Sequence, residues 1–239
     1  MTVDYYEIQI DDVIGTLSYD TVFEQCMSAQ YNPTNTLAGN QYCAFIQRNQ
    51  ETGGVLRVSA PRANLGHYET SGVDVQFNWR RSIGEGNLGL NVLASLLNTY
   101  EIQDTPASKP VDIVGTNGAP GGAQFEYRTF TTINYFKGPF STALRWRHYP
   151  DIKHQTYRLD PNTLTHGSSA YDVLDFNGRF AFNERYEIRF GIDNLADKEP
   201  PTYGRNMDVY PYNSGSGQTL SSVYDVLGRR GYVGFTAEF

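Results

Sequence analysis

The chain has 239 residues, a formal net charge of −7, and a composition of 39% hydrophobic and 14% aromatic residues. This acidic balance argues against a nucleic-acid partner, because general nucleic-acid binders need clustered Lys and Arg to neutralise phosphates. The longest apolar run, Val92 to Leu97, is far short of the roughly 20 residues that a transmembrane helix requires. A mean hydropathy of −0.49 is still compatible with a membrane β-barrel, whose spans are about 10 residues of alternating polarity.

The chain begins with an expected strand from about Val3 to Ile14. The residues around Met1 contain neither a basic segment nor an apolar segment of the kind that forms a signal peptide. We therefore expect either a cytosolic chain or a sequence whose true N-terminus is missing.

The stretch from Gly72 to Arg80 alternates strictly between apolar and polar residues. This period of two is typical of a strand whose faces meet two different environments. The polar phase consists of Asp74, Gln76, Asn78 and Arg80, opposite Val73, Val75, Phe77 and Trp79. A tight turn is expected over Arg81 to Asn87, after which Leu88 to Leu96 resumes the apolar face and completes a hairpin.

Two more hairpins follow. The first joins Gln124–Phe136 to Phe140–His148 through a turn at Lys137–Phe140. In its second strand, Arg145 and Arg147 are on one face, and Leu144 and Trp146 are on the other. The second joins Tyr171–Phe180 to Arg185–Asp193 through Ala181–Glu184. In the second strand of this hairpin, Glu187 and Arg189 are on one face, and Tyr186, Ile188, Phe190 and Ile192 are on the other.

Long connections alternate with these short turns. They run over Gly15 to Asn64, Asp104 to Ala123, Pro150 to Ser168 and Ala196 to Ser222. Loops beyond about 12–15 residues are uncommon in compact soluble domains, whereas outer-membrane barrels combine short periplasmic turns with long extracellular loops. We therefore predict an all-β fold, an antiparallel transmembrane β-barrel segment of about eight long strands. The polar-phase residues are candidates to face the lumen: Asp74, Gln76, Asn78, Arg80, Arg145, Arg147, Glu187 and Arg189.

The last strand is expected from about Val223 to Phe239. Val233, Phe235, Ala237 and Phe239 share one face of this strand, so the terminal ring is predicted to belong to a lipid-facing stripe.

Two motifs near the end of the chain resemble a known family. Gly191–Gly204 (GIDNLADKEPPTYG) and Tyr224–Arg230 (YDVLGRR), followed by the terminal Phe239, resemble the C-terminal end of TonB-dependent outer-membrane receptors. The residues that carry the resemblance are Asn194, Leu195, Asp197, Lys198, Tyr224, Gly228, Arg229 and Phe239. Asn64–Gln76 and Val3–Ile10 are also similar to the family's barrel strands. Ala196 departs from the pattern, because the family usually has an aromatic or bulky residue there.

The resemblance implies a non-enzymatic, TonB-energised importer of a scarce nutrient such as a ferric siderophore, cobalamin or an oligosaccharide. Such receptors have about 22 strands around a plug domain, so residues 1–239 are expected to be the C-terminal portion of the barrel without the plug. The implied location is the bacterial outer membrane. The implied partners are outer-membrane lipid, the nutrient ligand, and the plug domain and TonB through the missing N-terminal part.

Cys26 and Cys43, the two cysteines of the chain, both fall in the first long loop. In an external loop they are predicted to form a disulfide, since that compartment is oxidising. Free cysteines in a cytosolic protein are the alternative. No catalytic residue, cofactor or metal site is expected, because the four His lack metal-ligand spacing and no nucleophile motif occurs.

Two other functions remain open from the sequence. One is a self-contained small outer-membrane barrel with a structural or adhesive role. The other is a secreted carbohydrate-binding β-sandwich.

Overall fold

The fold is described here from a computed structural model that covers residues 1–59, 62–105, 108–118, 122–155, 162, 167–202 and 219–238. The chain divides into two compact units. The first, which we call the sheet unit, comprises Met1–Glu7, Ser71–Tyr100 and Ile113–Phe239; the second, the loop unit, comprises Ile8–Thr70 and Glu101–Asp112. Within the described residues, no helix is long and apolar enough to cross a membrane.

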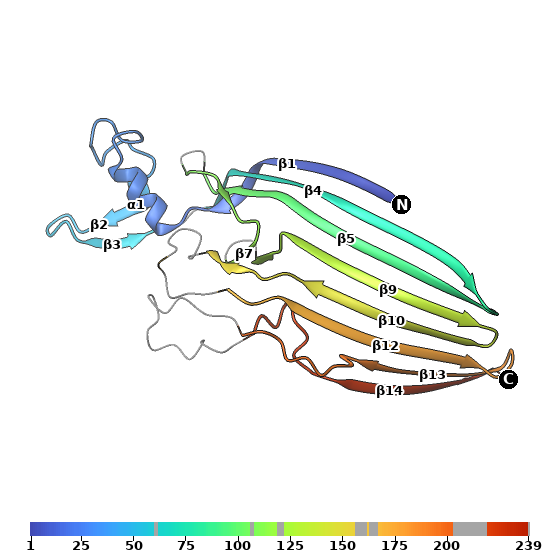
Figure 1. Cartoon of the computed structure of the whole chain (residues 1–239). Coiled ribbons are helices and arrows are strands. Elements are labelled where there is room, and N and C mark those ends of the chain that lie inside the picture. Colours follow the sequence, from blue (N-terminus) through green and yellow to red (C-terminus); the bar gives the residue numbers. More distant parts are fainter. Residues whose placement is uncertain are drawn as a thin grey trace. The chain divides into compact units, whose positions relative to one another are not determined.

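The main sheet is a meander in which long strands pair in the order of the sequence (Figure 1). Within the described residues the order is β1-β4-β5-β9-β10-β12-β13-β14, with short β6 added beside β5. The bounds are β1 Thr2–Thr16, β4 Arg62–Ile83, β5 Gly86–Gln103, β6 Val111–Asp112, β9 Tyr127–Lys137, β10 Phe140–Tyr149, β12 Tyr171–Ala181, β13 Tyr186–Asp193 and β14 Arg230–Ala237. The predicted antiparallel all-β fold with about eight long strands is therefore confirmed, whereas a two-sheet sandwich is not what these strands form.

The two faces of this sheet differ in polarity, and the pairing register shows why. Ile188 lies opposite Phe235, and Phe190 lies opposite Val233, so apolar side chains continue across neighbouring strands. One residue along, Glu187 pairs with Thr236 on the other face. Because side chains alternate along a strand, a matched register keeps one face apolar and the other polar throughout. We call them the apolar face and the polar face.

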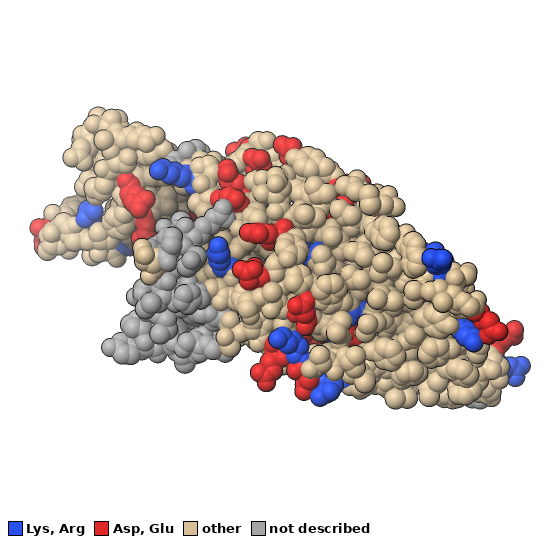
Figure 2. Space-filling model, in the orientation of Figure 1, with Lys and Arg blue, Asp and Glu red and all other residues tan. Residues whose placement is uncertain are grey.

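Figure 2 shows an expanse without charged residues over the strands of the main sheet, with Lys, Arg, Asp and Glu gathered toward the strand ends. Apolar side chains that are normally buried stay exposed here. Val233 has an exposed fraction of 75% and Phe235 one of 65%. Contiguous exposed apolar surface of this kind marks a protein or membrane contact.

Glycines within the sheet allow aromatic rings to lie flat across neighbouring strands. A Cβ on Gly178 would meet the Phe190 ring at 2.4 Å, and one on Gly191 would meet the Tyr232 ring at 2.5 Å. Each ring covers backbone that its glycine partner leaves bare, as in the aromatic rescue of glycines used in sheet design.

The short turns are tighter in one case than the sequence predicted. Instead of a turn over Arg81 to Asn87, β4 continues to Ile83 and β5 begins at Gly86, which leaves two turn residues. Gly84 supplies the positive φ, 61°, that such a turn requires. The turn between Lys137 and Phe140 is confirmed, and the third hairpin turn falls within one residue of the predicted Ala181–Glu184.

Two predicted strand limits were wrong, for one physical reason. Gln124 belongs to a separate short strand, and β9 starts only at Tyr127; the last strand starts at Arg230 rather than Val223. Phe125 and Tyr224 are instead buried together in a cluster with Ile152, Tyr171 and Val173. Because these two side chains are buried in the cluster, the segments that carry them do not pair as strands of the main sheet. Phe239 lies outside the described residues.

Short strands in the connections form a second, three-stranded sheet in the order β11-β7-β8. Their bounds are β7 Thr116–Gly118, β8 Gly122–Gln124 and β11 Lys153–His154. β7 and β11 are parallel, which ties the connection after β5 to the connection after β10.

The loop unit has its own small core, although the sequence predicted only a long connection from Gly15 to Asn64. It contains α1 (Tyr19–Met27), the 3-10 helix η1 (Cys43–Phe45), and the paired strands β2 (Ile46–Arg48) and β3 (Val55–Val58). Ser18 caps α1, because its Oγ accepts a hydrogen bond from the Thr21 amide at 3.0 Å.

The predicted disulfide between Cys26 and Cys43 is present and joins α1 to η1. Both cysteines are buried with Leu17, Val22 and Ile46. Asn32, also buried, donates from Nδ2 to the Cys26 carbonyl at 2.8 Å. A cluster this small depends on its covalent link, since small cores alone stabilise weakly.

Candidate functional site

Residues predicted to face the lumen lie together on the polar face of the main sheet. Asp74, Gln76 and Arg147 line one cavity of about 480 Å³, which is also bounded by Arg128 and Tyr149. Asn78 and Arg80 line a second cavity of about 420 Å³. The side chains of one polar phase thus share hollows on one side of the sheet, where a ligand or another segment of protein can be bound.

Ion pairs and ring contacts hold most of the charged side chains on this face. Arg147 contacts Asp175 at 3.1 Å. Arg179 and Arg189, which lie directly opposite one another, share Glu187 at 2.5 and 3.5 Å. Two arginines facing each other repel, so the shared carboxylate stabilises this part of the sheet.

Arg145 differs from these side chains. Its guanidinium lies over the Phe130 ring, 5.5 Å from the ring centre, and among the described residues it contacts no carboxylate. A cation–π contact of this type contributes about 0.5–1 kcal/mol where it is exposed. Arg145 is therefore a cation of the polar face that forms no ion pair among the described residues, although Asp175 lies opposite it on β12.

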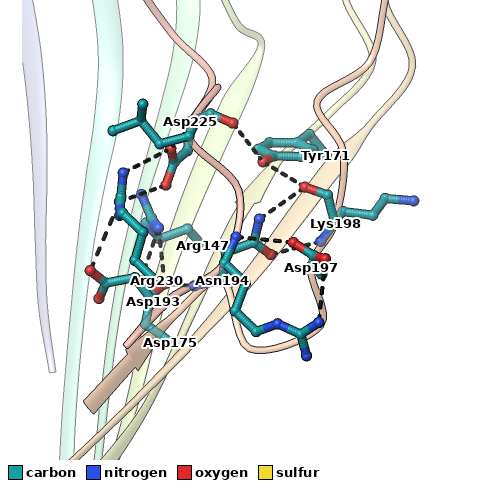
Figure 3. Close-up of polar contacts among 11 residues, drawn as sticks. Arg147, Tyr171, Asp175, Asp193, Asn194, Asp197, Lys198, Asp225 and Arg230 are labelled. Atoms are coloured by element: carbon teal, nitrogen blue, oxygen red, sulfur yellow. Dashed lines mark hydrogen bonds and ion pairs between the residues drawn. The ribbon is translucent and has the colours of Figure 1, made fainter. Parts of the chain in front are cut away.

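A second polar network joins the end of β13 to the segment before β14, and we call it the C-terminal clasp (Figure 3). Its centre is Asn194, which is fully buried and has a φ of 51°. The Asn194 amide donates to Asp175 at 2.9 Å, while its side chain exchanges two hydrogen bonds with the backbone of Lys198, at 2.8 and 3.0 Å. Asn tolerates this left-handed conformation better than most residues and mimics a backbone turn, which accounts physically for Asn at this motif position.

Asp197 holds the other half of the motif. Its carboxylate accepts from the Arg229 amide at 3.0 Å and from the Arg229 guanidinium at 3.3 Å. Gly228, next to Arg229, has a φ of 71°, and a Cβ there would lie 3.4 Å from the Asp197 carboxylate. The Gly-Arg pair thus turns the chain so that one carboxylate can bind both the backbone and the side chain of Arg229.

Arg230 completes the clasp at the first residue of β14. Its guanidinium contacts Asp225 at 2.9 Å and Asp193 at 3.8 Å. Tyr171, almost fully buried, donates its hydroxyl hydrogen toward the carbonyls of Lys198 and Asp225, at 3.3 and 3.4 Å. The first residue of β14 is therefore held by charge to the end of β13.

Tyr224 lies in the aromatic cluster beside the clasp. Its hydroxyl hydrogen-bonds Ser168 Oγ at 2.8 Å, and its ring packs edge-on against Tyr171 with ring centres 5.0 Å apart. Burial raises the pKa of the Tyr224 phenol above its ordinary value, and the hydrogen bond from Ser168 opposes this only in part. The side chain is therefore held neutral.

The structure thus brings together Asn194, Asp197, Lys198, Tyr224, Gly228 and Arg229, six of the eight motif residues. Leu195 is joined to the sheet through its backbone, whose amide donates to the Leu174 carbonyl at 2.6 Å. Sequence reasoning missed Asp175, Asp225 and Arg230. For Asp175 a signal existed, because it falls in the polar phase of β12 opposite Arg145.

Comparison with known proteins shows the family of the chain. The family model described as TonB dependent receptor-like, beta-barrel matches residues 1–195. The chain belongs to the TonB-dependent receptor family. This family is one of bacterial outer-membrane transporters and receptors rather than of enzymes.

A solved structure agrees with this TonB-dependent receptor chain in fold. A single-residue mutant of the ferric enterobactin receptor (PfeA) from Pseudomonas aeruginosa has a TM-score of 0.62 and 13% sequence identity to it. The match covers 99% of this chain and 28% of that receptor, so the chain spans little more than a quarter of its length. No curated protein sequence matches the chain.

Proposed function

We propose that residues 1–239 form the C-terminal portion of the barrel of an outer-membrane, TonB-energised importer. In this proposal the apolar face contacts outer-membrane lipid and the polar face lines the lumen. The observation that carries it is the register of the main sheet, which keeps one face apolar over long antiparallel strands while ion pairs cover the other. A lipid-facing band with a polar interior is what a membrane barrel requires.

The edges of the sheet favour a portion of a larger barrel over a small closed one. Within the described residues, β1 and β14 each pair on one side only and not with each other. Unpaired strand edges are not tolerated in lipid. Closure therefore needs further strands, which in this proposal come from an N-terminal part that also carries the plug domain and contacts TonB.

The proposed cargo is a scarce nutrient too large for passive diffusion, with ferric siderophores, cobalamin and oligosaccharides as candidate classes. The ferric enterobactin receptor that shares the fold motivates the first of these. Arg145 and Arg128 are candidate contacts for an anionic cargo or for acidic residues of a plug, in a region where Asp4 and Asp74 also line the cavity.

The test is uptake in the native bacterium. A strain lacking the gene should lose accumulation of one radiolabelled nutrient from a panel of ferric siderophores, cobalamin and oligosaccharides. Restoring the gene should restore uptake, but not in a strain without TonB. Uptake that continues without TonB contradicts the importer proposal. An antibody against the loop unit supplies a second readout, because a native species of 26.9 kDa instead of one several times heavier contradicts the larger barrel.

A further inference from the structure

The first cavity of the polar face, of about 480 Å³, carries opposite charges on its two sides, and we call it the mixed-charge cavity. Asp4 and Asp74, from the neighbouring strands β1 and β4, line one side, and Arg128 from β9 lines the other. Among the described residues none of these three side chains forms an ion pair or a side-chain hydrogen bond. Arg147 also lines the cavity, but it already contacts Asp175 at 3.1 Å. Two carboxylates and one guanidinium are therefore free to bind a ligand.

The pairing of the strands fixes how far apart these charges lie. The side chains of Asn78 and Asn91 hydrogen-bond between β4 and β5. Four residues along this antiparallel pair, Asp74 lies opposite Ser95, and Ser95 lies opposite Arg128 on β9. Neighbouring strands are about 4.8 Å apart, so the backbones that carry Asp74 and Arg128 are roughly 10 Å apart. The two opposite charges thus lie on either side of β5, with the small side chain of Ser95 between them.

The floor of the mixed-charge cavity is apolar, although the cavity opens on the polar face. Leu93 and Phe130 lie opposite one another on β5 and β9, in the next row of the same face. Leu93 has an exposed fraction of 42%. An apolar side chain of a ligand can cover this surface, which removes it from water, while charged groups of the same ligand reach the row of Asp74 and Arg128.

A ligand with a single charge fits the mixed-charge cavity poorly. An anion that contacts Arg128 is repelled by Asp4 and Asp74, and a cation that contacts the two carboxylates is repelled by Arg128. A molecule with an ammonium and a carboxylate on one carbon atom satisfies both sides at once, through charge-assisted hydrogen bonds of about 2.7–2.9 Å. The span of roughly 10 Å between the two backbones has room for one such group. The arrangement of charges therefore favours a zwitterion.

We propose that the mixed-charge cavity binds an α-amino-acid group, with an apolar side chain, that forms part of the cargo. Its ammonium donates to Asp4 and Asp74, its carboxylate accepts from Arg128, and its side chain covers Leu93 and Phe130. The volume of about 480 Å³ lies within the range of small-molecule sites, roughly 300–1,000 Å³. This assignment rests on the proposed function, because it needs the polar face to line a lumen that cargo enters.

L-Phenylalanine is the probe, because it carries the ammonium, the carboxylate and the apolar side chain of the proposed group. Saturation-transfer NMR on the protein in its full natural length, reconstituted in nanodiscs, gives its dissociation constant and those of 3-phenylpropanoate and 2-phenylethylamine. The first analogue lacks the ammonium, and the second lacks the carboxylate. We expect each analogue to bind about three- to tenfold more weakly than L-phenylalanine, because each loses the charge-assisted hydrogen bonds of one side.

Variants of the cavity should reproduce the loss of each charged group of the ligand. Replacing Asp4 and Asp74 together by Asn should weaken binding of L-phenylalanine by a similar factor without weakening binding of 3-phenylpropanoate. Arg128→Gln should weaken binding of L-phenylalanine without weakening binding of 2-phenylethylamine. Arg189→Gln is the matched control, because Arg189 lies on the same face outside the cavity and contacts Glu187; it should leave all three dissociation constants unchanged. Since a general loss of structure would weaken binding of every ligand, this pattern is specific to the cavity.

Two outcomes overturn the proposal. One is L-phenylalanine that binds no more tightly than its two analogues, and the other is wild-type protein that does not bind it, for example because a segment of the plug fills the cavity. TonB-dependent uptake of a nutrient by a protein that fails this binding test refutes the amino-acid site alone. Uptake that continues without TonB refutes the proposed function instead, so the two failures are distinguishable.

Discussion

Replacing Phe190 by Arg tests whether the apolar face contacts lipid. Phe190 lies near the middle of the apolar stripe on β13, between Ile188 and Ile192. Its ring covers Gly178 on β12 and packs against the Phe176 ring, with centres 6.3 Å apart. The substitution therefore removes a cross-strand aromatic contact and places a guanidinium among apolar side chains.

Two terms set the expected magnitude. An Arg on the lipid face near the bilayer midplane costs about 2–4 kcal/mol. Loss of the aromatic pair adds about 0.5–1.5 kcal/mol. We therefore expect the free energy of unfolding to fall by roughly 3–5 kcal/mol. If the same face were in water, only the loss of the aromatic pair would remain, and the free energy of unfolding would fall by about 0.5–1.5 kcal/mol.

The assay is reversible urea unfolding of the full-length protein in lipid vesicles, followed by protection from protease. Arg189→Ala is the matched control, because the neighbouring side chain lies on the polar face, is 60% exposed and contacts Glu187 at 3.5 Å. Such a pair contributes about 0–1 kcal/mol. A cost for Phe190→Arg no larger than that of the control would refute the assignment of the apolar face to lipid.

Three further predictions concern the loop unit and the connections. Replacing Cys26 and Cys43 together by Ser should destabilise the loop unit by about 3 kcal/mol, measured as faster amide hydrogen exchange in α1 and contradicted by unchanged exchange there. Asn194→Ala should cost about 2–3 kcal/mol in urea unfolding, since it removes two part-buried hydrogen bonds to Lys198 and leaves Ala at a positive φ; a change below 0.5 kcal/mol would contradict the role of Asn194 in the clasp. Burial lowers the pKa of His154 below its ordinary 6.5, so the folded state binds fewer protons there than the unfolded state. Stability around β11 should be complete above pH 6.5 and be lost as pH falls below it, seen as lower amide-exchange protection factors, corrected for intrinsic exchange, at pH 5 than at pH 7; His154→Asn should abolish this difference.

The long strands could be predicted because their pattern is set by a difference between two environments. Leu144 and Trp146 alternate with Arg145 and Arg147, and the register keeps each pair on its own face. Alternation is local in the sequence, so it can be read without knowing which strand lies next to which. The turn at Gly138 was likewise local, with a φ of 52° that glycine allows.

The parts that could not be predicted depend on contacts between distant residues. Tyr224 falls within the strand expected from Val223 to Phe239, yet a cluster with Phe125 and Tyr171 buries it. The clasp depends on Asp225 and Asp193 meeting at Arg230, and neither aspartate stands out from other loop or strand acids in the sequence. The motif residues were identified by resemblance, whereas their physical reason, a left-handed Asn194 fixed by Asp175, needed the structure.

The sequential strand order affects how the number of strands in such a sheet can change during evolution. Every long strand pairs with the next one along the chain. A hairpin therefore forms main-chain hydrogen bonds only with the strand before it and the strand after it. Duplicating or deleting one pair of strands leaves all other pairings intact and returns the chain to the same side. The number of strands in the sheet can therefore increase or decrease by whole hairpins. The long connections, at the end of the strands away from the short turns, can diversify independently.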